Sequence, residues 1–127
     1  MLKSIDNIPS VSVVIATYNG EKYLREQLDS IITQTYPIYE IIISDDQSTD
    51  GTMQVVDEYS KKYPFVKGFV KPVKNGLNEN FMYGFSKATG DYIAYSDQDD
   101  IWLPTKIEVQ MAAIGNNMLC LSQSHFF

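Results

Sequence analysis

The stretch VSVVIATYNG, from Val11 to Gly20, decides how this chain is expected to fold. Its first seven residues are mostly apolar and β-branched, and a polar turn follows them directly. A run of this length and composition is typical of a strand that is buried on both faces, as the strands of parallel sheets are. The turn then introduces a helix, for which Asn19 is the expected N-terminal cap.

The same alternation of strand and helix continues along the chain. Four more apolar runs are predicted as strands: YEIIIS at 39–44, FVKGFV at 65–70, DYIAYS at 91–96 and MLCLS at 118–122. Apolar residues at helical spacing predict helices at 21–35, at 53–63, around 81–88 with Asn78 as its cap, and at 104–113. The order of elements predicts an α/β domain with a mostly parallel sheet flanked by helices.

Composition narrows the class of protein. The 127 residues fit one domain, and a net charge of -6 argues against nucleic acid or an anionic membrane surface as the main partner. With Cys120 as the only cysteine and His125 as the only histidine, neither a disulfide within the chain nor a Cys/His zinc site is expected. No signal peptide and no apolar run of about 20 residues is recognised, so an intracellular location is expected.

Three polar clusters follow three of the predicted strands. TYNG follows the first strand, DDQSTDGT the second and DQDD the fourth. In an open parallel sheet the carboxyl ends of the strands share one edge, and ligands bind in the crevice there. These clusters are therefore expected to converge into a binding site for a small ligand.

The segment DQDD indicates what that ligand carries. Carboxylates are hard oxygen ligands that suit Mg²⁺ or Mn²⁺, and Asp97 and Asp99 are spaced to point the same way in an extended segment. Such an ion usually completes its coordination with substrate phosphates, so a diphosphate is the expected ligand. The alternative is a solvated acidic turn that caps a helix beginning near Trp102.

The segment DDQSTDGT also allows two interpretations. Ser48, Thr49 and Asp50 are ordinary caps for the helix that follows. Asp45 and Asp46 end the strand itself, where hydrogen bonds could recognise a base or a ribose. Tyr18 could stack on a base or pack against the strand, and Trp102 could belong to the core.

Three long segments together resemble the family 2 glycosyltransferases, which have the GT-A fold: VSVVIATYNGEKYLREQLDSIITQTY, EIIISDDQSTDGT and NGLNENFMYGFSKATGDYIAYSDQDDIWLPTKIE. The resemblance runs from about Val11 to about Ser122 and implies a Rossmann-like half-domain that binds a nucleotide sugar. The form SDQDDIWLP is similar to a branch of bacterial polysaccharide transferases that includes rhamnosyltransferases.

The resemblance implies a role for each residue that matches the family motifs. Asp97-Gln98-Asp99 stands at the D-x-D motif, with Asp99 as the main metal contact and Asp97 near the ribose or the metal. One of Asp45 and Asp46 would contact the base. The remaining implied residues are Ala16, Thr17 and Tyr18 at the base pocket and Asp100 and Trp102 beside the donor sugar.

The implied reaction transfers a sugar from a UDP- or dTDP-sugar to a hydroxyl of a saccharide or lipid-linked acceptor, with inversion and with Mg²⁺ or Mn²⁺. The expected setting is cell-surface polysaccharide synthesis in the cytoplasm, at the inner face of the membrane. The family's catalytic base belongs to a second half of the enzyme and is expected beyond Phe127. Residues 1–127 are therefore interpreted as an incomplete GT-A domain.

Two other functions stay open from the sequence. A nucleotidyltransferase also places acidic metal ligands at a sheet edge, although ATYNGEKY is a poor match to its Gly-rich basic loop. The third interpretation is a non-catalytic domain that binds a nucleotide sugar or a partner protein. A sheet edge and apolar surface left uncovered by a missing second half would favour a homodimer or an aggregate.

Overall fold

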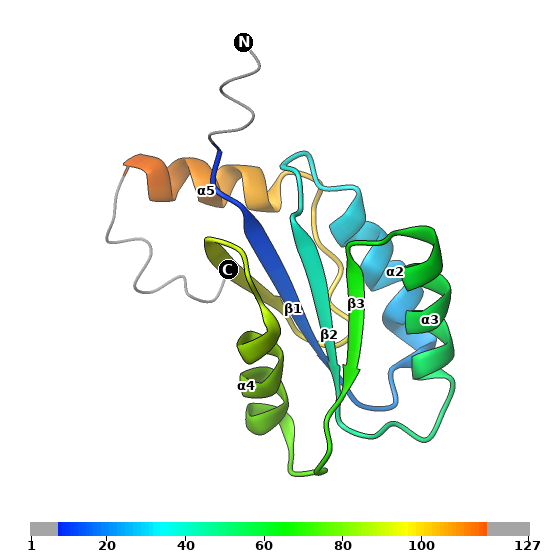
Figure 1. Cartoon of the computed structure of the whole chain (residues 1–127). Coiled ribbons are helices and arrows are strands. Elements are labelled where there is room, and N and C mark those ends of the chain that lie inside the picture. The colour runs from blue at the N-terminus through cyan, green and yellow to red at the C-terminus, as the bar shows by residue number, and fades with distance from the viewer. Residues whose placement is uncertain (1–7, 117–127) are drawn as a thin grey trace.

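The computed structural model describes residues 8–116, and a four-stranded parallel sheet forms its centre (Figure 1). The strands are β1 (Val11–Thr17), β2 (Glu40–Asp45), β3 (Val66–Val70) and β4 (Tyr92–Ser96), in the spatial order β3-β2-β1-β4. β1 pairs with both β2 and β4, and every pairing is parallel. The predicted α/β class with a parallel sheet is confirmed.

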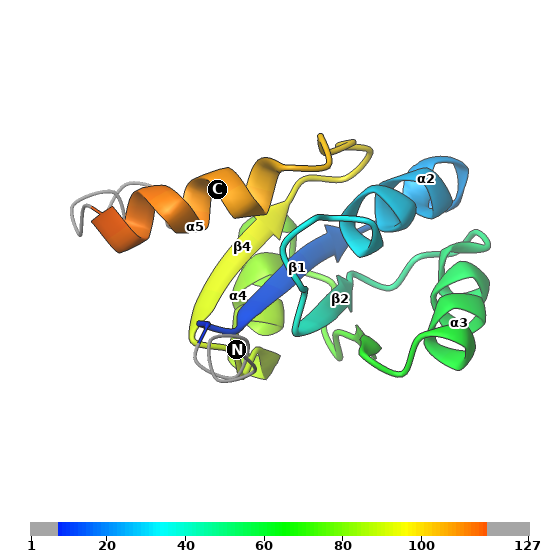
Figure 2. The ribbon, with the colours of Figure 1, turned by 90° about the horizontal axis from the view of Figure 1, so that it is seen from above.

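Helices connect the strands and cover both faces of the sheet. They are α2 (Glu21–Ile32), α3 (Thr52–Lys62), α4 (Leu77–Lys87) and α5 (Lys106–Asn116). The view from above shows α4 on one side of the sheet and the other three helices on the opposite side (Figure 2). None of the helices among residues 8–116 is long and apolar enough to cross a membrane.

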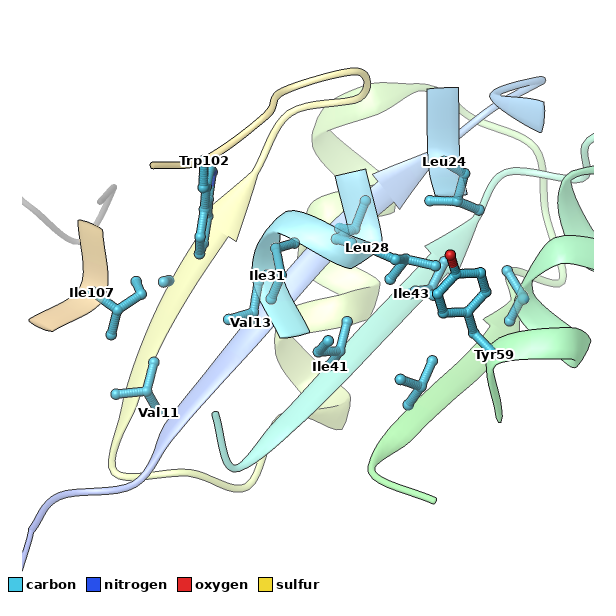
Figure 3. Packing of buried hydrophobic residues seen from close by; sticks show 14 of the residues in the cluster. Val11, Val13, Leu24, Leu28, Ile31, Ile41, Ile43, Tyr59, Trp102 and Ile107 are labelled. Atoms are coloured by element: carbon cyan, nitrogen blue, oxygen red, sulfur yellow. The ribbon is translucent and has the colours of Figure 1, made fainter. Parts of the chain in front are cut away.

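The core is divided by the sheet into two clusters, because successive side chains of a strand point to opposite faces. The larger cluster joins Val13 and Ile43 of the sheet to Leu28, Tyr59 and other residues of the helices (Figure 3). The smaller one packs α4 against the other face, with Val14, Ala16, Ile42 and Phe81 buried. Burying a side chain of this kind contributes roughly 1.5–3 kcal/mol, so both faces stabilise the sheet.

The approach of α4 to the sheet depends on Gly84. A Cβ atom at this position would lie 2.6 Å from Cγ1 of Val14 and 3.2 Å from Cβ of Ser44. The missing side chain lets the helix lie close to β1 and β2. This closeness places the first turns of α4 beside the carboxyl ends of the two strands.

Asn19 and Asn78 are not the N-terminal caps of α2 and α4 that the sequence predicted; the N-cap residues are Gly20 and Gly76. Asn19 has a left-handed backbone (φ 51°), and its Oδ1 accepts hydrogen bonds from the N–H groups of Thr49 and Asp50 instead. The Asn19 side chain therefore binds the loop that precedes α3 instead of α2. At the start of α2, the N–H of Glu21 is accepted by Asp50 Oδ2. Asn78 is the second residue of α4 rather than its cap, since Leu77 is the first.

The N-cap residue of α3 is Gly51, whereas the sequence had suggested Ser48, Thr49 or Asp50. Asp50, directly before it, nevertheless satisfies a free N–H of that helix. Its Oδ1 accepts the N–H of Thr52, the first residue of that helix, over 2.9 Å. In return, Glu21 Oε1 accepts the N–H of Gly51 over 2.8 Å. The beginnings of α2 and α3 thus satisfy one another's free N–H groups, which joins two of the predicted polar clusters. The predicted strand at 118–122, Cys120 and His125 lie outside the described residues.

Candidate functional site

A cavity of about 600 Å³ opens at the carboxyl ends of β1 and β2, where α4 begins. Along the sheet, β2 and β3 follow one another on one side of β1 and β4 lies on the other, so the order of the strands changes direction at β1. Ligands of open α/β sheets bind at such a switch point. The cavity is lined by Ala16, Thr17, Tyr18, Asp46, Lys74, Asn75, Gly76, Leu77, Asn80 and Gln98. Residues of all three predicted polar clusters meet there.

Tyr18 and Lys74 form one wall of the cavity. Lys74 Nζ lies 4.2 Å from the centre of the Tyr18 ring and donates a hydrogen bond to Tyr18 Oη over 2.6 Å. The Tyr18 side chain is 39% exposed, so it does not belong to the core. It is therefore available to stack on a planar ligand, with an ammonium group beside it.

The two acidic residues at the end of β2 have different surroundings. Asp45 is fully buried and accepts hydrogen bonds from Thr17 Oγ1 (2.6 Å), Ser48 Oγ (2.6 Å) and the Ser48 N–H (2.8 Å). These bonds fix the loop after β2. Asp46, by contrast, lines the cavity. Asp46 is therefore the member of the pair placed to meet a ligand.

A buried lysine accompanies Asp46. Lys71 Nζ lies 3.2 Å from Asp46 Oδ1, and both side chains are more than 90% buried. The other oxygen, Oδ2, accepts the N–H of Gly76 over 3.2 Å. The ion pair compensates the buried carboxylate, and the hydrogen bond from Gly76 ties it to the residue that precedes α4.

Asn80 was not predicted as part of the site, although it is central to its construction. The side chain is 1% exposed and bridges two strands from α4. Its Oδ1 accepts a hydrogen bond from Ser44 Oγ over 2.6 Å, and its Nδ2 donates to the carbonyl of Thr17 over 3.1 Å. Asn80 therefore fixes the distance between α4 and the strand ends that frame the cavity.

The D-Q-D loop is held by a buried glutamine of α2. Gln27 Nε2 donates to Ser96 Oγ (2.8 Å) and to the carbonyl of Asp97 (2.6 Å), while its Oε1 accepts the N–H of Asp99 (3.3 Å). Asp99 adopts a left-handed backbone conformation, with φ 62°. With the backbone fixed in this way, the carboxylates of Asp97 and Asp99 are both exposed.

These two carboxylates fit a metal ion only in part. Within residues 8–116 no group of three or more His, Cys, Asp or Glu side chains is arranged to hold one. Mg²⁺ is commonly bound through one or two carboxylates together with substrate phosphates. Asp97 and Asp99 thus suit an ion that shares its coordination with a phosphorylated ligand, rather than a site made by protein alone.

Asp100 and Trp102 do not line this cavity. They line a second one of about 370 Å³ beside the start of α5. Trp102 is 5% exposed and belongs to the larger core cluster. Of the two interpretations of this residue from the sequence, core residue or neighbour of the donor sugar, the structure therefore supports the first. Asp100 donates its N–H to the carbonyl of Asp97 over 3.1 Å, which closes the turn between the two cavities.

Comparison with known proteins identifies the family. Residues 12–125 match the family model described as Glycosyl transferase family 2. The chain therefore belongs to the family 2 glycosyltransferases. It is 40% identical over 117 residues to the dTDP-rhamnosyl transferase RfbG of Shigella flexneri, a match that covers 87% of this chain and 40% of RfbG.

Solved glycosyltransferases share the fold. The S. aureus TarS 1–349 complex with UDP-GlcNAc matches with a TM-score of 0.78 and 29% identity, over 86% of this chain and 32% of TarS. The mannosyltransferase PcManGT of Pyrobaculum calidifontis, in complex with GDP-Man and Mn²⁺, matches with a TM-score of 0.68 and 29% identity, over 74% of this chain and 28% of PcManGT. The expected GT-A fold is confirmed, and the chain spans less than half the length of each of these three relatives.

Proposed function

We propose that this chain is the donor-binding part of a glycosyltransferase, and that its ligand is a nucleoside-diphosphate sugar. The observation that carries the proposal is the cavity at the switch point of the sheet, where Tyr18, Asp46 and Gln98 meet from the loops after β1, β2 and β4. TarS and PcManGT, which have the same fold, are described in complex with UDP-GlcNAc and with GDP-Man and Mn²⁺.

The lining residues suit the parts of such a ligand. Tyr18 offers an exposed ring on which a base can stack. Asp46 offers a carboxylate oxygen that can accept a hydrogen bond from a base N–H, and Lys71 keeps it compensated. The exposed carboxylates of Asp97 and Asp99 lie on the loop that Gln98 joins to Tyr18, so a diphosphate would lie between the base pocket and this loop.

A bound Mg²⁺ or Mn²⁺ would stabilise the negative charge on the nucleoside diphosphate as it leaves the sugar. Asp97 and Asp99 are the residues that would hold it, with the phosphates as the remaining ligands. Asp45 has no part in this, because its oxygens are engaged by Thr17 and Ser48. Metal dependence is therefore assigned to the D-Q-D loop alone.

We propose that the sugar passes from the nucleotide to a hydroxyl group of the acceptor in a single displacement. A carboxylate base would take the proton of the acceptor hydroxyl while that oxygen attacks the anomeric carbon with inversion. The likeness to RfbG, a dTDP-rhamnosyl transferase, favours a dTDP-sugar, and the likeness to TarS, solved with UDP-GlcNAc, favours a UDP-sugar. Cell-surface polysaccharide synthesis is the setting proposed from the segment SDQDDIWLP. Membership of the family favours sugar transfer over nucleotidyl transfer.

Calorimetry with UDP-GlcNAc, dTDP-rhamnose and GDP-mannose tests the proposal. One of them is expected to bind, more tightly with Mn²⁺ than with EDTA, and Asp99→Ala should remove that difference. Asp57→Ala, an exposed aspartate of α3, is the matched control and should preserve it. If none of the three nucleotide sugars binds, with or without Mn²⁺, the assignment of the cavity to a nucleotide sugar is wrong.

A further inference from the structure

Gln27 is a buried polar residue on the apolar face of α2. Its side chain is fully buried, and its buried neighbours on that helix are Leu24, Leu28 and Ile31. A buried amide group is destabilising unless its hydrogen bonds are made, and an apolar side chain of similar size would pack here without that cost. The reason for a glutamine at this position must therefore lie in what its amide group binds.

The amide group of Gln27 binds the end of β4 and the D-Q-D loop. Its Nε2 donates to Ser96 Oγ and to the carbonyl of Asp97, and its Oε1 accepts the N–H of Asp99. A side-chain amide has two protons to donate, so both are used. Gln27 thus spans the loop and keeps the Asp97 carbonyl and the Asp99 N–H on its inner side.

The loop is a tight turn whose backbone would suit glycine. The N–H of Asp100 donates to the carbonyl of Asp97 over 3.1 Å, which closes a turn of four residues. Asp99 is the third residue of this turn and has a φ of 62°. A positive φ at that position is typical of a type II turn, in which glycine or asparagine usually occupies it. Other residues keep such a conformation when their surroundings impose it, and the bond from the Asp99 N–H to Gln27 is a contact that does so.

We propose that Gln27 is a positioning residue for the metal ion: by fixing the backbone of the D-Q-D loop, it sets the affinity of Asp97 and Asp99 for Mn²⁺ in the nucleotide complex. This inference rests on the proposed function, which assigns the ion to these two carboxylates. With the Asp97 carbonyl and the Asp99 N–H turned toward Gln27, both carboxylates are exposed. Ligands that are already in place bind an ion more tightly than ligands that must first be ordered.

A second buried glutamine provides a matched control. Gln34, just after the end of α2, is 8% exposed; its Nε2 donates to the carbonyl of Leu103 over 2.7 Å, and its Oε1 accepts the N–H of Ile107 over 3.0 Å. Gln34 therefore ties the beginning of α5 to the end of α2 through the same kind of contact. Its partners lie outside the D-Q-D loop, so its loss should not disturb the metal ligands.

Calorimetry of Gln27→Met tests the inference, because methionine keeps the unbranched shape and lacks the amide group. The ligand is whichever of UDP-GlcNAc, dTDP-rhamnose and GDP-mannose the unsubstituted chain binds most tightly, measured with Mn²⁺ and with EDTA. We expect the gain in affinity from Mn²⁺ to fall about tenfold, as it commonly does when a residue behind a metal ligand is changed, while the affinity in EDTA stays the same. Gln34→Met should keep the full gain, although urea unfolding should show a similar loss of stability in both variants.

Three results would overturn the inference. The first is a Gln27→Met protein that keeps the full gain from Mn²⁺. The second is a Gln27→Met protein that loses affinity equally with Mn²⁺ and with EDTA, and the third is a Gln34→Met protein whose gain falls as much. An unsubstituted chain that binds the nucleotide sugar equally well in both conditions would refute the metal site of the proposed function, and this inference with it.

Hydrogen exchange of the unsubstituted chain tests the positioning without any substitution. Because the Asp99 N–H donates to a buried acceptor, it should exchange slowly in the protein without ligand, before any ion is added. An Asp99 amide that exchanges as fast as that of an unfolded peptide would show that Gln27 does not hold the loop, and the inference would be wrong.

Discussion

Gln98 and Tyr18, which are 80 positions apart, are joined by a hydrogen bond in which the Tyr18 N–H donates to Gln98 Oε1 over 2.9 Å. Gln98 is the middle residue of D-Q-D, and Tyr18 lines the proposed base pocket. The adjacent Gly20 keeps room for this contact, since a Cβ there would lie 2.9 Å from the same oxygen. The proposed base pocket and the D-Q-D loop are therefore held at a fixed distance by one side chain.

Gln98→Leu should loosen that relationship. We expect nucleotide affinity to fall severalfold and the free energy of unfolding to fall by only about 0.5–1.5 kcal/mol, the usual net value of one hydrogen bond. Calorimetry and urea unfolding measure the two effects. Gln54→Leu on α3, away from the cavity, is the control, and equal loss of affinity in both variants would contradict the role given to Gln98.

Asp45 and Asp46 should respond differently to substitution by asparagine. Asp45→Asn weakens the bonds that hold the loop after β2 and should cost about 1.5–3 kcal/mol of stability. Asp46→Asn leaves Lys71 uncompensated and should also destabilise the fold, by about 3–5 kcal/mol if the lysine stays charged. At a temperature where both variants are folded, only Asp46→Asn should lower nucleotide affinity, by about tenfold. A larger loss of affinity in Asp45→Asn would reverse the assignment.

Gly84→Ala should push α4 away from the sheet. The added methyl group would lie 2.6 Å from Val14 Cγ1, and such overpacking usually costs about 1–3 kcal/mol. Ser86→Ala, exposed on the same helix, is the control for the gain in helix propensity. Thermal unfolding compares the two, and a Gly84→Ala protein as stable as the control would show that the helix can shift freely.

The stability of the fold should depend on the protonation of Glu40. Burial raises the pKa of this carboxyl, but the hydrogen bonds that it accepts outweigh that effect, so its pKa lies below the ordinary value of 4.5. Ser12 Oγ donates to it over 2.7 Å and the Thr89 N–H over 2.6 Å. Lys67 Nζ lies 3.0 Å away.

Because the pKa of Glu40 is lower in the folded than in the unfolded chain, its stabilisation is complete above about pH 4.5 and is lost as the pH falls through the folded value. Urea midpoints between pH 7 and pH 3 should therefore fall more steeply in the unsubstituted protein than in Glu40→Gln. Parallel curves for the two proteins would show that Glu40 does not contribute to the acid sensitivity.

The strands could be predicted from the sequence because their burial leaves a local signature. The run Val11–Thr17 was predicted with the bounds that β1 has. The D-Q-D loop was found because carboxylates crowded after a strand have few purposes other than binding or capping. Both inferences need only the residues of one segment and the geometry of a parallel sheet.

The residues that were missed act across the chain. Lys74 and Asn80 contact strand ends more than 30 positions away, and nothing in their own segment marks them. Gln27 did leave a signal, because it stands on the apolar stripe of α2 beside Leu24 and Ile31, where a polar residue must be buried with a partner. The cap predicted at Asn19 failed because the beginnings of α2 and α3 exchange their caps, which a local rule does not foresee.

The position of the bound nucleotide tests the central claim most directly. Amide chemical shifts of the isotope-labelled chain, recorded during titration with the nucleotide sugar that calorimetry selects, map that position residue by residue. The account predicts the largest changes at Thr17, Tyr18, Gly76 and Gln98. Added Mn²⁺ should broaden the signals of Asp97 and Asp99 first. Tyr18→Ala should abolish the changes, and Tyr39→Ala, at the opposite end of the sheet, should not. Changes centred on Thr105 to Gln110, or a Tyr18→Ala protein that binds as well as the original, would contradict it.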